Sequence, residues 1–250
     1  MLKAWGITEK GGVRPTNEDC FVIDDSLRLL LVADGMGGHR AGEVAAHLAA
    51  DAILDLLRHP PSDWTHGYDP ALSPAANLLK TSVHFANEIV LKTADQSDRY
   101  TGMGTTIVAA LVIGDRLAVA HVGDSRLYLL SHGRLRLLTR DDTWMVAMMA
   151  ADPKADPEAF EHHPMRHALT NVVGAWPTMN VHVVERMLNE GDLLLLTTDG
   201  VHSVIEDRRL EELLLSGDPP QAAASTLVNQ AIVRGSRDNC TAVVARYTNG

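Results

Sequence analysis

The chain has 250 residues and a formal net charge of −10, and 46% of its residues are hydrophobic while 4% are aromatic. This length suits one large domain or two small ones, and the apolar content is that of a globular protein with a packed core. The acidic balance and the lack of any basic run argue against a general affinity for nucleic acid or for an anionic membrane surface.

The first part of the chain predicts strands followed by helices. Short apolar runs between turn-rich pieces indicate three strands, at residues 2–8, 20–24 and 27–34. Apolar residues at helical spacing predict two helices, one at 41–59 and one from about Pro74 to Ala94.

The rest of the chain returns to strands before it ends in helices and a last strand. Residues 104–139 hold four apolar runs separated by breaks of two or three residues, which are typical of hairpins in an antiparallel sheet. Residues 140–178 are irregular or weakly helical, contain four prolines and are predicted to be a flap. The remaining predicted elements are strands at 181–187, 192–199 and 239–247 and helices at 207–215 and 220–234. Strands and helices that come in groups favour an α+β fold over a parallel, doubly wound one.

Five segments place an acidic residue at the end of an apolar strand. Asp34, Asp124 and Asp199 come directly after apolar runs, whereas Asp238 and residues 17–19 come directly before them. An unpaired carboxylate is costly to bury, so a placement that recurs five times needs a common explanation. Mg²⁺ or Mn²⁺ provides one, because these ions bind carboxylates, backbone carbonyls and water.

The glycines Gly35 and Gly200 fit the same explanation, since backbone without a Cβ can approach an ion or a phosphate closely. The alternative for any single site is an ordinary turn, because Asp-Gly pairs are common in turns. We interpret Asp115, which follows Gly114, as such a hairpin residue. The other sites differ because each stands in a fuller local pattern.

Taken in order, seven short motifs resemble those of the metal-dependent type 2C family of serine/threonine protein phosphatases, especially its compact bacterial members. The motifs are RPTNED (14–19), DGMGGH (34–39), GMGTT (102–106), GDSR (123–126), LTRD (138–141), TDG (198–200) and DN (238–239). A single Asp-Gly pair carries little information, but this ordered series covers nearly the whole chain.

The resemblance implies a fold and a reaction. The fold is a four-layer α-β-β-α sandwich, in which helices flank two central antiparallel sheets and the metal site lies at one end. Residues 1–250 would form a single catalytic domain with a flap-like insertion at about 140–178. The reaction is hydrolysis of phosphoserine or phosphothreonine by direct attack of a water or hydroxide that bridges two metal ions and has a lowered pKa.

The resemblance also implies the principal metal ligands. Asp34 bridges two ions, Asp199 and Asp238 complete the coordination of one of them, and the Gly35 carbonyl binds the other. The cofactors are then two to three Mn²⁺ or Mg²⁺ ions.

Further residues take outer roles by the same resemblance. Asp19 and Glu18 act through metal-bound water, and Asp124 joins Asp199 in binding a third, weaker ion. Arg14 holds the substrate phosphate, so that Arg14 and Asp34 are the catalytic residues. The charges of the ions and of Arg14 offset the charge of the phosphoryl group during its transfer.

The resemblance implies phosphorylated proteins as substrates, a bacterial serine/threonine kinase as the opposing partner, and a monomer. We expect no nucleic-acid or membrane partner. The N-terminus lacks the apolar core of a signal peptide, and no run approaches the roughly 18 to 20 apolar residues of a membrane span, so we expect a cytoplasmic location.

Two other functions compete with phosphatase activity. A non-catalytic phosphoprotein-binding or regulatory member of the same fold would have lost metal ligands, yet Asp34, Asp199 and Asp238 are all present. A nucleotide-binding phosphate loop at residues 34–39 would need a following Gly-Lys-Ser/Thr and a parallel βαβ unit, and the sequence offers neither.

Three positions depart from common patterns of the family. Met36 stands where many eukaryotic members carry a histidine proposed as the general acid, and the nearby His39 is at least as well explained as a residue flanking the next helix. Asp142 stands where histidine is usual, and Ser203 replaces an acidic residue. None of these changes removes a predicted primary metal ligand.

Several reactive side chains are assigned to packing. We interpret Cys20 and Cys240 as small buried core residues, since their spacing matches neither a zinc site nor a disulfide framework. His162, His163 and His167 suggest a metal cluster by number alone, but flap or surface packing explains them better. The apolar run 145–149 is interpreted as the core of the flap.

Overall fold

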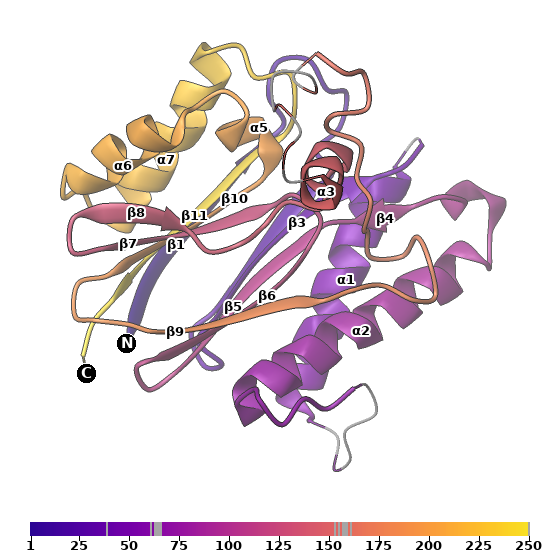
Figure 1. The fold of residues 1–250 in the computed structure, drawn as a ribbon, viewed down its shortest axis with the longest axis horizontal. Coiled ribbons are helices and arrows are strands. Elements are labelled where there is room, and N and C mark those ends of the chain that lie inside the picture. Colours follow the sequence, from indigo (N-terminus) through magenta and orange to yellow (C-terminus); the bar gives the residue numbers. More distant parts are fainter. Residues whose placement is uncertain are drawn as a thin grey trace.

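The computed structural model describes residues 1–38, 40–60, 62, 67–152, 154, 156, 160 and 162–249. Within these ranges the strands form two antiparallel sheets, one of five strands and one of six. Figure 1 shows the sheets at the centre with a group of helices on each outer side. The expected α+β sandwich with flanking helices is therefore confirmed.

The five-stranded sheet has the order β1-β11-β10-β7-β8. Its strands are β1 (Leu2–Glu9), β7 (Arg126–Ser131), β8 (Arg134–Leu137), β10 (Leu193–Thr197) and β11 (Cys240–Tyr247). The first and last strands of the chain pair along their whole length, from Leu2 opposite Tyr247 to Glu9 opposite Cys240. The helices on its outer face are α5 (Asp199–His202), α6 (Asp207–Leu215) and α7 (Pro220–Val233).

The six-stranded sheet has the order β2-β3-β5-β6-β9, with β4 paired to β3. Its strands are β2 (Asp19–Asp24), β3 (Leu29–Met36), β4 (Gly104–Thr105), β5 (Ile107–Ile113), β6 (Arg116–Val122) and β9 (His182–Met187). The long helices α1 (Ala41–Arg58) and α2 (Pro74–Ala94) cover its outer face.

Three hydrophobic clusters hold the four layers together. One joins α1 and α2 to the six-stranded sheet through residues such as Leu31 and Ile53. A second lies between α5 to α7 and the five-stranded sheet, and the third fills the space between the sheets with alternate side chains such as Val32 and Val243. This alternation follows from the strand period of two residues, which sends neighbouring side chains to opposite faces.

Local signals in the sequence fix the start of helix α2 at the position predicted for it. Helix α2 begins at Pro74, where the Ser73 hydroxyl accepts a hydrogen bond from the Ala76 backbone N–H at 3.2 Å. Serine before the first turn with proline at its first position is a favourable start for a helix. None of the helices in the described part of the chain is long and apolar enough to cross a bilayer.

Residues 140–178, called the flap segment below, contain helix α3 (Trp144–Ala151). The Thr143 hydroxyl caps this helix by accepting from the Val146 backbone N–H at 3.4 Å. No side chain of α3 is fully buried, so residues 145–149 are half-buried and form a core only in part. Isolated bridges join Thr143 to Leu169 and Thr105 to Val173, and the second bridge ties the flap segment to β4.

Candidate active site

A cavity of about 480 Å³ brings together seven of the eight site residues predicted from the sequence. Its walls include Arg14, Glu18, Asp34, Gly35, Asp124, Asp199 and Asp238. The eighth residue, Asp19, is buried directly opposite Asp34 in the pairing of β2 with β3. Segments far apart in the sequence thus meet at one place, as the strand-end pattern predicted.

The GMGTT motif fixes the backbone of Asp34. The Asp34 carbonyl oxygen accepts hydrogen bonds from the Thr106 backbone N–H and the Thr105 hydroxyl, both at 2.9 Å. The Asp34 backbone N–H donates to the Thr106 hydroxyl at 3.0 Å, and that hydroxyl lies 2.7 Å from the Ser125 hydroxyl. The carboxyl group therefore projects from a backbone whose own polar groups are satisfied.

Burial and mutual repulsion raise the pKa values of five carboxyl groups here, those of Glu18, Asp19, Asp34, Asp124 and Asp199. Burial, aided by the charges of Asp19 and Asp199, raises the pKa of Asp34 well above its ordinary value. Burial also raises the pKa of Asp19 to about 7, against hydrogen bonds from Thr241 and Thr198 that lower it. The pKa values of Asp124 and Asp199 rise to about 7 and about 6, again chiefly through burial.

Such a cluster is unfavourable when every member is ionised and no cation is near. Two of its buried oxygens, Oδ1 of Asp19 and Oδ1 of Asp199, have no hydrogen-bond partner in the described structure. Carboxylate oxygens are hard ligands that suit Mg²⁺ and Mn²⁺, so the donor set fits these ions in its chemistry. Among the described residues, however, no group of three or more His, Cys, Asp or Glu side chains is arranged so that it could hold a metal ion as it stands.

Arg14 lies at the mouth of the cavity, where its Nη2 donates to Oδ2 of Asp238 at 2.6 Å. About half of the Arg14 side chain is exposed to solvent. The hydrogen bond to Asp238, ahead of the electrostatic effects of nearby acids, raises the pKa of the Arg14 guanidinium, which stays charged. Arg14, which the family resemblance assigns to the substrate phosphate, thus donates a hydrogen bond to Asp238, a predicted metal ligand.

Asn239 holds the loop that carries Arg14 and Glu18. Its Nδ2 donates to the Lys10 carbonyl at 3.0 Å and to the Thr16 carbonyl at 2.9 Å. Its Oδ1 accepts from the Glu18 backbone N–H at 2.9 Å. The second residue of the DN motif therefore fixes the position of the first motif of the chain.

The GDSR and LTRD motifs meet in a half-buried ion pair. Nε and Nη2 of Arg126 donate to the two oxygens of Asp141, at 3.0 and 2.7 Å. Nη1 of Arg126 donates to the Tyr128 hydroxyl at 3.0 Å, and that hydroxyl donates to Asp207 at the start of α6. This chain of contacts links the beginning of the flap segment to the strand that follows Asp124.

Asp142 joins the flap segment to the turn before Asp124. Its Oδ2 accepts from the Gly123 backbone N–H at 3.0 Å and from Nδ2 of Asn171 at 2.8 Å. Its Oδ1 lies 2.8 Å from Nε2 of His182, whose ring stacks on that of the buried His121. The aspartate that departs from the family pattern is therefore fully engaged with other groups.

Gly35 and Gly200 are explained by packing within the protein. A Cβ at Gly35 would collide with the Gly42 carbonyl, and one at Gly200 would collide with the Asn239 carbonyl. The sequence suggested that these glycines make room for an ion or a phosphate, whereas the neighbour that needs the space is protein backbone. The Gly35 backbone N–H also donates to the Glu18 carbonyl at 3.1 Å.

Some assignments differ from those made on the sequence. Asp199 was expected at the end of a strand, but β10 ends at Thr197 and Asp199 opens the short helix α5. His167 was assigned to packing, yet its side chain lines the cavity beside Asp34. It stands in an irregular segment, where no periodic pattern reveals which way a side chain points.

The packing assignments hold elsewhere. Cys20 and Cys240 are both buried and unbridged. His163 stacks on Trp144 with ring centroids 4.2 Å apart. His39 lies outside the described residues.

The comparisons with known proteins agree with this architecture. The family model described as protein phosphatase 2C matches residues 15–218. The serine/threonine phosphatase stp of Listeria monocytogenes serotype 4b is 32% identical over 240 residues, which is 95% of this chain and 92% of that protein. The serine/threonine protein phosphatase PstP of Mycobacterium tuberculosis is 34% identical over 98% of this chain, which spans 45% of that longer protein.

Solved structures are similar over nearly the full chain. The crystal structure of the Mycobacterium tuberculosis serine/threonine phosphatase PstP superposes with a TM-score of 0.85 at 32% identity, and the alignment covers 99% of both chains. The catalytic domain of PstP in complex with two manganese ions has a TM-score of 0.82 at 32% identity, covering 99% of this chain and 98% of that one. The chain therefore belongs to the protein phosphatase 2C family.

Proposed function

We propose that this protein is a metal-dependent protein-serine/threonine phosphatase, a hydrolase of phosphoric monoesters. The observation that carries the proposal is the cavity in which Asp34, Asp124 and Asp199, with raised pKa values, face the cation Arg14. The carboxylates of such a cluster are suited to bind divalent cations, and the nearby Arg14 guanidinium is suited to bind a phosphate. Relatives named serine/threonine phosphatases support the same conclusion.

The metal ligands follow from this proposal. Asp34, Asp199, Asp238 and the Gly35 carbonyl would hold two Mn²⁺ or Mg²⁺ ions, and Asp124 with Asp199 would hold a third. Asp19 and Glu18 orient waters around them. When bound, the ions neutralise the phosphoryl oxygens and make an attacking hydroxide available near neutral pH.

The chain's own residues position the substrate. Arg14 donates one N–H to Asp238, and its guanidinium makes no other hydrogen bond to the described residues, so its remaining donors can bind two oxygens of the phosphate. Asn239 keeps the Arg14 loop next to Asp238, so phosphate and metal ligands are held together. The backbone bonds from Thr105 and Thr106 fix the direction of the Asp34 carboxyl group. Positioning of this kind accounts for much of the rate of phosphoryl transfer.

The cellular setting is part of the proposal. Residues 1–250 act as one catalytic domain with residues 140–178 as its flap, and the substrates are phosphorylated proteins. A serine/threonine kinase supplies them, and the enzyme works as a cytoplasmic monomer. Bacterial relatives named serine/threonine phosphatases support phosphorylated proteins as the substrates.

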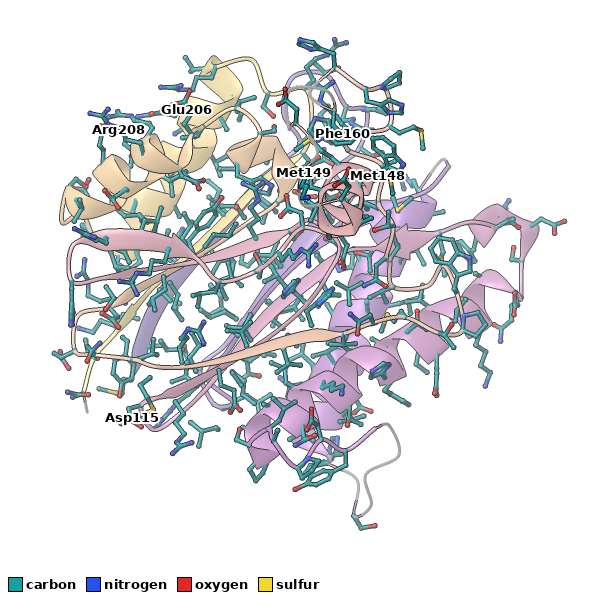
Figure 2. The ribbon with its side chains drawn as sticks, viewed as in Figure 1. Asp115, Met148, Met149, Phe160, Glu206 and Arg208 are labelled. Atoms are coloured by element: carbon teal, nitrogen blue, oxygen red, sulfur yellow. The ribbon has the colours of Figure 1, made fainter. Side chains whose placement is uncertain are left out.

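The test is hydrolysis of a phosphothreonine peptide by purified protein, with a chelator or with added Mn²⁺. We expect activity only with the ion, and a loss of about 10² to 10³-fold in Asp34→Asn and Asp238→Asn. The matched control is Asp115→Asn, because Asp115 is exposed in the turn that starts β6, whereas Asp124 follows the other end of that strand. Figure 2 labels Asp115 far from the flap residue Met148.

If the Asp34→Asn variant is as active as the native protein, the assignment of Asp34 as a metal ligand is wrong. A folded native protein that stays inactive at millimolar Mn²⁺ would overturn the proposed function and favour a phosphoprotein-binding role. The Asp115→Asn variant separates these outcomes from a general effect of removing one negative charge.

A further inference from the structure

A second cavity adjoins the acidic one. Its volume is about 430 Å³, and it shares Asp124, His167, Asp199 and Asp238 with the first cavity. The two cavities therefore meet at the acidic cluster, one on the side of Arg14 and the other on the side of α3. A substrate whose phosphate lies over the cluster can place a neighbouring part of itself in the second cavity.

The walls of the second cavity combine apolar surface, three arginines and four aspartates. Of the aspartates, Asp141 is paired with Arg126, and Asp124, Asp199 and Asp238 belong to the acidic cluster shared with the first cavity. Met145 and Val146 of α3 supply apolar surface. Arg126, Arg166 and Arg237 supply positive charge. Aliphatic surface beside a guanidinium suits a side chain that has a short carbon stem and an anionic end.

The three arginines differ in whether their charge is already used. Arg126 is bonded to both oxygens of Asp141. Arg166 donates from Nε to the His167 ring at 2.9 Å. Arg237 is exposed, and in the described part of the chain its guanidinium has neither an ion pair nor a hydrogen bond. Arg237 is thus the cation in this cavity that is fully free to bind a ligand.

Arg237 is not bonded to the acid next to it in the chain, among the residues that the structure describes. It precedes Asp238 in the chain, but Oδ2 of Asp238 accepts from Arg14 and Oδ1 accepts from the Asn239 backbone N–H. Arg237 lines only the second of the two cavities. Arg14 and Arg237 therefore line different cavities beside the predicted metal ligands, and of these two only Arg14 is bonded to Asp238.

We propose that the second cavity is a peptide subsite that takes an acidic side chain close to the phosphorylated residue, with Arg237 binding its anionic group. This inference rests on the proposed function and adds a substrate preference to it. Residues of an extended peptide rise about 3.3 Å each, so an acid one to three positions away reaches a cavity that borders the phosphate site. The protein carries a net charge of −10, which repels acidic peptides at long range, so a local cation decides whether such a peptide is accepted.

The experiment compares phosphothreonine peptides that differ at a single flanking position. That position, scanned from three before to three after the phosphothreonine, carries Glu, Gln or Lys, and kcat/KM is measured with Mn²⁺. The proteins are native, Arg237→Glu and Arg237→Lys. The control is Arg208→Glu, which removes an exposed arginine on α6, and Figure 2 labels Arg208 at a distance from the α3 residues Met148 and Met149.

Native enzyme should prefer Glu to Lys at one of these positions by about three- to tenfold, as expected for a single exposed charge pair. Arg237→Glu should reverse the ratio, Arg237→Lys should keep most of it, and Arg208→Glu should leave it as in the native enzyme. The ratio should also shrink at high salt, because exposed charges are screened. Each ratio is taken within one protein, so a general change of activity caused by the neighbouring Asp238 cancels.

The failures are distinguishable. If native enzyme hydrolyses none of the peptides, the proposed function is wrong. If it hydrolyses them and Arg237→Glu shows the native ratio at every position, the function stands and the subsite is wrong. A preference for Glu that survives in Arg237→Glu but disappears when Arg166→Gln is made would assign the subsite to the other arginine and overturn the role of Arg237.

Discussion

Strand β2 begins at Asp19 and ends at Asp24, and these two carboxyl groups lie in opposite electrostatic settings. Asp24 accepts hydrogen bonds from the Ser26 hydroxyl, the Leu27 backbone N–H and the Arg58 guanidinium, which together hold its pKa well below the ordinary value. Asp19 accepts from the hydroxyls of Thr198 and Thr241, but its other oxygen has no partner among the described residues, and burial raises its pKa to about 7.

This contrast separates carboxylates that stabilise the folded protein from carboxylates that need a bound cation. A carboxylate that has a cation and several donors stabilises the folded state. A buried carboxylate near other acids destabilises it until a cation arrives or a proton binds. The Asp24 carboxylate thus stabilises the folded protein. The buried Asp19 carboxylate lowers the stability of the metal-free protein but lies where a cation can bind.

The largest expected effect is that of metal and pH on stability. Between about pH 4 and pH 7 the folded, metal-free protein keeps protons on Asp19, Asp124 and Asp199 that the unfolded chain has released. The folded state binds more protons there, so the contribution of these groups to the free energy of unfolding falls as pH rises. Mn²⁺ should reverse this, adding about 2.7 kcal/mol at 100 times its Kd.

Urea unfolding at several pH values, with a chelator or with Mn²⁺, measures this effect. The difference between the two series at each pH removes the contribution of groups away from the site. It should grow from pH 5 to pH 7, because the ion replaces protons. A difference that shrinks with rising pH would contradict this account of the acidic cluster.

The substitution Asp19→Asn tests the contrast between the two ends of β2. Asn keeps an oxygen to accept from Thr198 and Thr241, yet removes the buried charge. We expect Asp19→Asn to weaken Mn²⁺ binding by roughly 10- to 100-fold, as for other groups that support metal ligands. At neutral pH the metal-free variant should be at least as stable as the native protein, because less repulsion acts on Asp34 and Asp199.

Calorimetric titration with Mn²⁺ and urea unfolding in chelator give the two readouts. Asp24→Asn is the matched variant at the other end of the same strand and should leave the Mn²⁺ affinity unchanged. Equal affinities in native protein and Asp19→Asn would show that Asp19 serves the fold alone.

Asp142 provides an intermediate case, because its donors include His182 rather than a permanent cation. Hydrogen bonds from His182 and Asn171 lower its pKa against the effect of burial. We expect Asp142→Asn and His182→Gln to be less destabilising together than the sum of the single changes, with a coupling of about 0.5–2 kcal/mol. Unfolding of the two single variants and the double variant measures it, and strict additivity would mean that the contact contributes nothing.

Local chemistry made much of the fold predictable. The bounds of α2 agree with the sequence because the Ser73 cap, Pro74 and the apolar spacing all act within a few residues. Those of α6 agree because its buried residues, such as Leu210 and Leu214, recur at helical spacing. Helix α3 was harder to predict, since WMVAMMAA is apolar on every side and has no amphipathic pattern. The order of strands in each sheet was not predictable from periodicity, which carries no information on long-range pairing.

The candidate site was likewise predictable only where local sequence determines it. The acidic residues stand out because a carboxylate at the end of an apolar run is chemically unusual. Their partners do not: the register that sets Asp19 opposite Asp34, and the turn that directs Arg237 into the second cavity, depend on tertiary packing. His167 was overlooked for the same reason, since its segment is irregular.

The smallest expected effect is that of Asp24→Asn on stability. The change weakens three hydrogen bonds, one of them from Arg58, whose side chain is 54% exposed and therefore partly screened. We expect a loss of about 1 kcal/mol at pH 7.

Because the pKa of Asp24 is lowered in the folded state, its contribution is complete above about pH 5 and is lost as the carboxyl group is protonated at lower pH. The native protein and Asp24→Asn should therefore approach equal stability in acid, as measured by urea unfolding from pH 7 down to pH 3. The acidic cluster acts in the opposite sense, so a gap that widens in acid would mean that Asp24 behaves like Asp19 and that the contrast between the two ends of β2 is wrong.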